Sequence, residues 1–231
     1  MKFTHILVVL CVAFVFFLSA CMSDWTARGY RQYQRGNYDG AIYDFGIALQ
    51  SSPTNTTALL FRALSFEQIG RPDNALADFK SALETTPSLA HVFVARAELY
   101  YRMCDFTNAA SDYRHAVDIG FSDGRLYRGY AWLLATCPDR GLRNGHKAVE
   151  IAEKAVQYER SVEAYCVLAA ALAEVGDYAK AVEMTKTAIN IIDRRRHPDM
   201  LKRAEWCLKL YEARQPWRQK DEPSEHWGQE H

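Results

Sequence analysis

The sequence lacks the short motifs that usually mark a catalytic site. Its 231 residues contain no G-x-S-x-G turn, no H-E-x-x-H zinc motif and no glycine-rich phosphate loop. The seven histidines are scattered, and His226 and His231 lie close to the end of the chain. The sequence therefore predicts no catalytic residue, no metal site and no cofactor, and we do not expect an enzyme.

An excess of charge of either sign is also missing, because 28 Lys and Arg residues balance 28 Asp and Glu residues. A nucleic-acid-binding protein normally carries a basic face, so this balance argues against nucleic acid as a partner. Hydrophobic residues make up 49% of the chain and charged residues 24%, which argues against intrinsic disorder. The composition is that of a folded, neutral protein.

Only one long apolar run is present, from Ile6 to Leu18. Its thirteen residues fall short of the roughly 20 that a membrane-spanning helix needs. Lys2 precedes the run and small residues follow it, which is the layout of a secretory signal peptide. We therefore expect residues 1–20 to be a signal peptide and the remainder to be exported.

The apolar run ends in Leu18-Ser19-Ala20-Cys21, which resembles the lipobox of bacterial lipoproteins. In that family a lipid is joined to the cysteine thiol, the peptide is cut before the cysteine, and the new amine is often acylated. The resemblance implies lipidation at Cys21. Met22 stands where an inner-membrane retention signal has Asp, so the resemblance favours an outer-membrane lipoprotein that faces the periplasm. The alternative is an ordinary signal peptide in which Cys21 is incidental.

Similar residues recur along the rest of the chain at a shift of 34 positions. The recurring residues are Ala41, Ala75 and Ala109, then Phe45, Phe79 and Tyr113, then Ala48, Ala82 and Ala116, and finally Pro53 and Pro87. This pattern resembles the tetratricopeptide repeat, a helix–turn–helix unit of 34 residues. The resemblance implies an all-α fold, a right-handed superhelical solenoid of about five helix pairs plus a C-terminal capping helix.

Each recurring residue type has a mechanical reason within such a repeat. Small residues stand in the middle of each first helix, where the second helix must come close. Large side chains in the second helices then fill the space between neighbouring units. The small positions of the first helices are Gly29, Ala63, Ala97, Ala131 and Ala169, and those of the second helices are Ala41, Ala75, Ala109, Ala148 and Ala181.

The repeat pattern sets the predicted boundaries. The solenoid is expected over residues 21–195, with repeats at 22–55, 56–89, 90–123, 124–161 and 162–195. The fourth repeat is longer because of a loop around Pro138. A capping helix is expected over 196–215, since an open repeat stack needs one for solubility. Residues 216–231 are polar and without periodicity, and we expect a disordered tail in which Trp217 packs back on the cap.

Four cysteines follow Cys21 and show no C-x-x-C spacing, so the sequence does not fix a pairing among them. An exported chain permits disulfides, but free and mostly buried thiols are the simpler expectation. Cys104 and Cys137 fall at nearly the same place in the first helices of adjacent repeats. Packed helices lie about 8–10 Å apart and a disulfide tolerates Cα separations up to about 7 Å, so we expect both thiols to be mainly reduced.

In tetratricopeptide-repeat proteins the first helices line a concave groove that holds a peptide or a partner helix. The resemblance gives an aromatic and aliphatic half and a cationic patch of arginines, which suits a hydrophobic segment flanked by an acidic residue. The alternative is that these side chains only pack within the solenoid or are solvated. The expected partner-binding residues are Tyr30, Tyr33, Leu60, Phe61, Leu64, His91, Tyr101, Arg102, Arg125, Arg128 and Trp132.

These observations together predict a membrane-anchored adaptor of the bacterial envelope. Its partners are expected to be membrane-associated envelope proteins that are bound in the concave groove. The alternative is a structural subunit that acts through self-oligomerisation.

Overall fold

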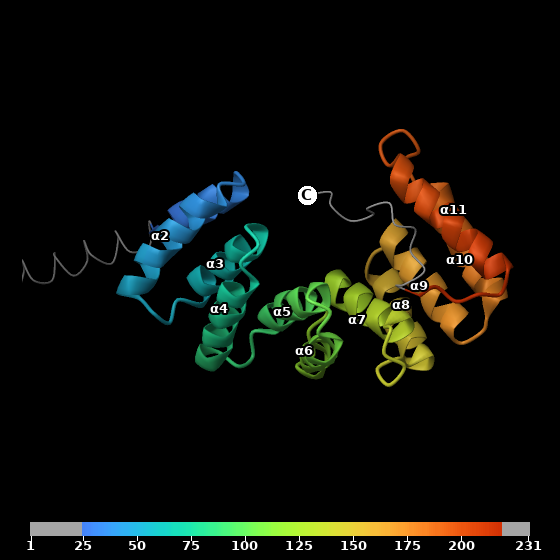
Figure 1. The fold of residues 1–231 in the computed structure, drawn as a ribbon, viewed down its shortest axis with the longest axis horizontal. Coiled ribbons are helices and arrows are strands. Elements are labelled where there is room, and N and C mark those ends of the chain that lie inside the picture. The colour runs from blue at the N-terminus through green and yellow to red at the C-terminus, as the bar shows by residue number, and fades with distance from the viewer. Residues whose placement is uncertain (1–24, 219–231) are drawn as a thin grey trace, which may run out of the picture. The chain divides into compact units, whose positions relative to one another are not determined.

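The structure, a computed structural model, describes residues 25–218. The predicted signal peptide, the lipidation residue Cys21 and most of the predicted tail therefore lie outside the described residues. Within the described range every regular element is a helix (Figure 1), which confirms the predicted all-α class. No helix in this range is both long enough and apolar enough to cross a membrane.

The helices alternate as the first and second members of successive pairs, and the last one follows the fifth pair as the predicted cap. Along the chain, helical residues 25–34 are followed by α2, α3 by α4, α5 by α6, α7 by α8, and α9 by α10. The bounds are α2 (Tyr38–Ser51), α3 (Thr56–Gln68), α4 (Pro72–Thr85), α5 (Ala90–Arg102), α6 (Phe106–Asp118), α7 (Gly124–Thr136), α8 (Gly145–Tyr158), α9 (Val162–Glu174), α10 (Tyr178–Ile191) and α11 (Pro198–Glu212).

The described chain divides into two compact units, and the division falls within α5 after Leu99. Unit 1 covers residues 25–99 of the described chain, and unit 2 covers residues 100–218. In unit 2, α7 packs on α8 and α9, α10 packs on α9, and α11 packs on α10. Each unit is thus built by stacking of sequential helix pairs.

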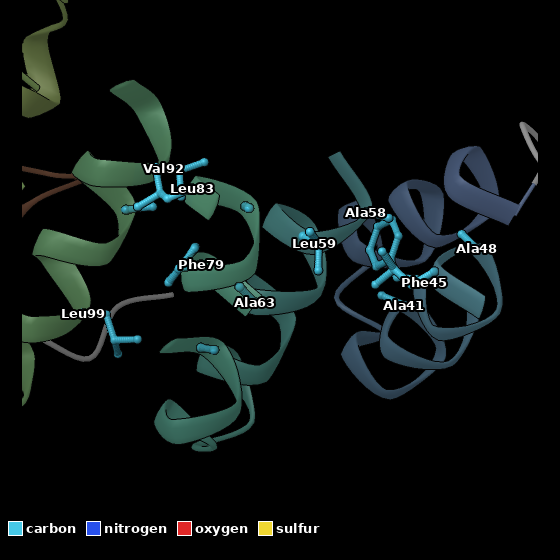
Figure 2. Packing of buried hydrophobic residues seen from close by; sticks show 14 residues of the cluster. Ala41, Phe45, Ala48, Ala58, Leu59, Ala63, Phe79, Leu83, Val92 and Leu99 are labelled. Atoms are coloured by element: carbon cyan, nitrogen blue, oxygen red, sulfur yellow. The ribbon is translucent and has the colours of Figure 1, made fainter. Parts of the chain in front are cut away.

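The core of unit 1 follows the predicted alternation of small and large side chains. Phe45 and Phe79 are fully buried among the alanines of neighbouring helices (Figure 2). Gly29 is buried opposite Phe45, and a Cβ added at Gly29 would lie only 2.8 Å from Phe45 Cδ1. The glycine is therefore required for close helix contact. All ten positions predicted to be small and buried are buried in the structure.

Short polar side chains define where most helices begin. Asn55 accepts a hydrogen bond from the backbone N–H of Ala58, and Ser161 accepts one from Ala164. Such N-caps satisfy backbone donors that have no partner inside the helix. The same arrangement occurs at Asn37, Asp105, Asp123, Asn144 and Asp177.

Four of the five first helices are followed by a left-handed residue that lets the chain turn into the second helix, and α7 is the exception. This residue is glycine at Gly36 (φ 73°), Gly70 (φ 72°) and Gly176 (φ 85°), but Cys104 holds the equivalent position with φ 60°. The turn after Cys104 is closed by a hydrogen bond from Asp105 N to Tyr100 O of 2.9 Å. Cys104 therefore adopts a conformation that disfavours any residue with a Cβ atom.

Replacing Cys104 with glycine is expected to stabilise the protein by about 0.5–1 kcal/mol, because the steric penalty of the left-handed conformation disappears. Cys104 is exposed, so the loss of its thiol removes little packing. Urea denaturation followed by circular dichroism measures the change, with Cys104→Ala as a control that keeps the Cβ atom and should give no gain. Equal stability of the glycine and alanine variants would contradict the strain at this residue.

Candidate protein-binding site

Five of the predicted groove residues lie together on unit 1 and form what we call the aromatic surface: Tyr30, Tyr33, Leu60, Phe61 and Leu64. The Phe61 ring packs edge-on against Tyr30 at 4.8 Å and against Tyr33 at 5.4 Å between ring centroids. Leu60 and Leu64 are partly buried against the core. Tyr30 is still 39% exposed. Packing on Phe61 and on the core therefore supports the aromatic surface, and Tyr30 is its accessible member.

The predicted cationic patch differs from the structure at Arg128. This guanidinium forms an ion pair with the carboxylate of Glu159, which follows α8. Arg128 is therefore already neutralised within the chain, and this pairing with a loop residue is not visible in the repeat pattern. Arg102 and Arg125 lie exposed on α5 and α7. His91 lies on α5, and partial desolvation of its ring lowers its pKa, so its imidazole is neutral at pH 7.

Trp132 and Tyr101, two further predicted residues, are brought together in unit 2. The Trp132 indole Nε1 donates a hydrogen bond of 3.0 Å to the Tyr101 hydroxyl. On α11, Arg203 places its Cζ atom 5.8 Å from the centroid of the Trp132 ring. The Trp217 ring lies 4.6 Å from the Trp132 ring. Trp132 is thus the centre of an aromatic and cationic cluster, of which the groove pattern identified only two members.

A cavity of about 280 Å³ opens beside Trp132 in unit 2. Burial raises the pKa of Cys166 to about 12, and burial also raises the pKa of Tyr211 well above its usual value. Both groups are therefore neutral at pH 7, and Cys166 is no reactive thiolate. The cavity is lined by Trp132, Val162, Glu163, Cys166, Val167, Thr185, Met200, Arg203, Ala204, Cys207 and Tyr211, which is a mostly apolar set.

The segment after α11 turns back onto unit 2. Arg214 takes φ 56°, and the N–H of Gln215 donates to Leu210 O at 2.9 Å, which closes the end of the helix. Trp217 is 2% exposed, in line with the expectation that it packs back on the folded helices. Trp217 also contacts α7 through Trp132.

An ion pair fixes this segment next to Trp217. Arg218 contacts Glu174 Oε2 at 2.6 Å, and Arg143 contacts Glu174 Oε1 at 3.0 Å. The side chains of all three residues are at most 21% exposed. The Glu174 carboxylate is thus shared between two guanidinium groups, one from a loop and one from the C-terminal segment.

The repeats also contain ion pairs between arginines and buried aspartates, which the sequence analysis missed. Arg28 contacts Asp44 at 3.1 Å, and Arg62 binds Asp78 through two bonds of 2.7 and 2.6 Å. A signal was present, since Arg28, Arg62 and Arg96, like Asp44, Asp78 and Asp112, recur at the 34-residue shift. These pairs join the first helix of a repeat to its second helix, so their role is structural. No group of three or more potential metal ligands occurs in residues 25–218.

Comparison with known proteins agrees with this architecture. Residues 26–90 match the family described as tetratricopeptide repeat. The fold is that of tetratricopeptide-repeat proteins. Such a fold is a protein-interaction scaffold and is generally not enzymatic. No curated protein matches the sequence significantly.

Three solved structures illustrate the likeness. TTC0263, a thermophilic TPR protein of Thermus thermophilus, is 20% identical with a TM-score of 0.60, over 82% of this chain and 100% of that one. PilF of Pseudomonas aeruginosa is 17% identical with a TM-score of 0.64, over 84% and 92%. YrrB, described as a TPR protein with an unusual peptide-binding site, is 18% identical with a TM-score of 0.61, over 73% and 82%. At these identities the likeness concerns the fold alone.

Proposed function

We propose that the chain is a lipid-anchored adaptor of the bacterial envelope, whose aromatic surface binds a segment of a membrane-associated protein. The observation that carries the binding role is the exposure of Tyr30 above a supported cluster of rings on a repeat scaffold. Rigid aromatic side chains lose little entropy on binding and dominate the energy of many interfaces. YrrB, which shares the fold, is described as having a peptide-binding site.

The anchoring role is supported by the Leu18-Ser19-Ala20-Cys21 sequence and by the short distance from Cys21 to the first helix. Only three residues separate Cys21 from Trp25, which is helical and is the first residue that the structure describes. The four steps from Cys21 to Trp25 span at most about 14 Å. A lipidated Cys21 would hold the first repeat close to the bilayer, which favours partners that are themselves associated with the membrane.

A photocrosslinking amino acid in place of Tyr30 is expected to capture a foreign envelope protein in intact cells. Tyr43 is the matched control, because it is also a tyrosine and is 65% exposed, but it lies on the second helix α2 and is not part of the aromatic surface. The yield at position 30 should exceed that at position 43 by at least about fivefold, as measured by immunoblotting and mass spectrometry.

Two results would count against this function. Equal yields at the two positions would show that the aromatic surface has no privileged partner. Capture of a second copy of the chain at position 30, with no foreign protein, would favour the structural subunit that acts through self-oligomerisation.

A further inference from the structure

The segment Pro216–Arg218 lies in a site built by two helices and a loop of unit 2. Trp132 from α7 packs on the Trp217 ring at 4.6 Å, and Glu174 at the end of α9 binds Arg218 at 2.6 Å. Arg143 from the loop between α7 and α8 holds the other oxygen of Glu174. We call the trio Trp132, Arg143 and Glu174 the Trp–Arg site.

We propose that the Trp–Arg site is a second peptide-binding site, which takes an aromatic residue followed by arginine. In this structure the chain's own Trp217 and Arg218 occupy it. A partner peptide of the same chemistry would displace them. This proposal does not depend on the aromatic surface or on lipid attachment.

The contacts fit an exchangeable ligand better than a permanent piece of core. The indole Nε1 of Trp217 is buried without a hydrogen-bond partner, which is unfavourable for a polar group. When Arg218 leaves, Glu174 keeps its ion pair with Arg143, so the site is not left with an isolated buried charge. The site can therefore be empty without leaving Glu174 as an unpaired buried charge. The internal ligand binds with one hydrogen-bond donor, Trp217 Nε1, unsatisfied.

The cavity beside the site offers a competing peptide additional apolar space, which Trp217 does not line. Trp132 forms one wall of this cavity, whose volume is about 280 Å³. Its walls are mostly apolar, with Glu163 and Arg203 as the charged members. A partner with a further apolar side chain near its aromatic–arginine pair would fill this space, and burial of apolar surface would favour it over the internal segment.

The proposal predicts that removing the internal ligand opens the site to a peptide added in solution. A fluorescent peptide with the sequence of residues 213–220 is titrated against the purified full chain, and binding is read from fluorescence anisotropy. A tethered segment has an effective concentration on the order of millimolar, which masks the site in the wild type. We expect the Trp217→Ala/Arg218→Ala variant to bind this peptide at least about tenfold more tightly than the wild type does.

Two controls identify the site. Adding Glu174→Gln to the double variant should weaken peptide binding at least about fivefold, because the ion pair with the peptide arginine is lost. A peptide with alanine at both ligand positions should not bind. Circular dichroism checks that each variant is folded. Arg218→Glu keeps Trp217 and removes only the ion pair of the internal segment, and we expect it to bind the peptide at least about threefold more tightly than the wild type does.

The proposal is overturned if the wild type, the double variant and Arg218→Glu all bind the peptide equally or not at all. In that case the segment serves only to cover the last helix pairs. A wild-type chain that forms dimers lost in the double variant would also overturn it, because the segment would then bind a second copy and not its own chain. Sedimentation velocity distinguishes this outcome.

Discussion

Replacing Cys21 with serine is expected to abolish lipid attachment and to leave an uncleaved precursor. In the proposed lipidation only a thiol can form the thioether to the lipid, and the small residues Ser19 and Ala20 would fit a protease that cuts directly before Cys21. Metabolic labelling with an alkyne fatty acid measures attachment, and the mobility of the chain on a gel measures cleavage. The expected loss of label is complete.

The size of this effect follows from the number of acyl chains involved. Each buried methylene contributes about 0.8 kcal/mol, so one chain binds a bilayer only reversibly while two or three give lasting attachment. Cys21→Ser should therefore lose this lasting lipid attachment, and any membrane association that remains would come from the apolar run of the uncleaved precursor. Cys11→Ala is the matched control, since it removes the other cysteine of the signal region and should change neither label nor cleavage. Persistent label in Cys21→Ser would show that the lipobox resemblance misleads.

The repeat pattern predicted the fold well because its physical cause is local. Helix pairs can stack closely only where small residues stand in the middle of the helices, and residues such as Ala63 and Ala131 are fully buried as predicted. Turn residues follow the same logic, since three first helices end in glycine. Cys104 is not a glycine, but it has the same left-handed backbone conformation at this position.

The candidate sites were only partly predictable, because they depend on contacts that the 34-residue period does not encode. The aromatic surface follows from repeat positions, and Tyr101 and Trp132 do so too. The Trp–Arg site involves the loop residue Arg143 and a segment that follows the last helix, neither of which repeats. Glu159 likewise neutralises Arg128 from a linker position. Irregular segments thus decide which groove residues are available to a partner.

Truncating Phe45 to alanine is expected to have the largest effect of any single side-chain change on the stability of unit 1. Phe45 is fully buried, lies opposite Gly29 and stacks on Phe61 with 6.3 Å between ring centroids. Gly29 has no side chain to fill the space, so the cavity cannot close without moving whole helices. Removal of a buried phenylalanine costs about 3–5 kcal/mol, against about 5–15 kcal/mol for the stability of a typical domain.

The loss should be confined largely to unit 1, because repeat units depend on their nearest neighbours for stability. Urea denaturation followed by circular dichroism should show an early transition in Phe45→Ala that accounts for part of the helical signal. Tyr43→Ala on the same helix is the control, since an exposed ring should change stability by no more than about 0.5 kcal/mol. A single unchanged transition in Phe45→Ala would contradict the packing between Gly29 and Phe61. Because Phe61 supports Tyr30, the same variant should also lose the crosslink at position 30, which links the core of the first repeat to partner binding.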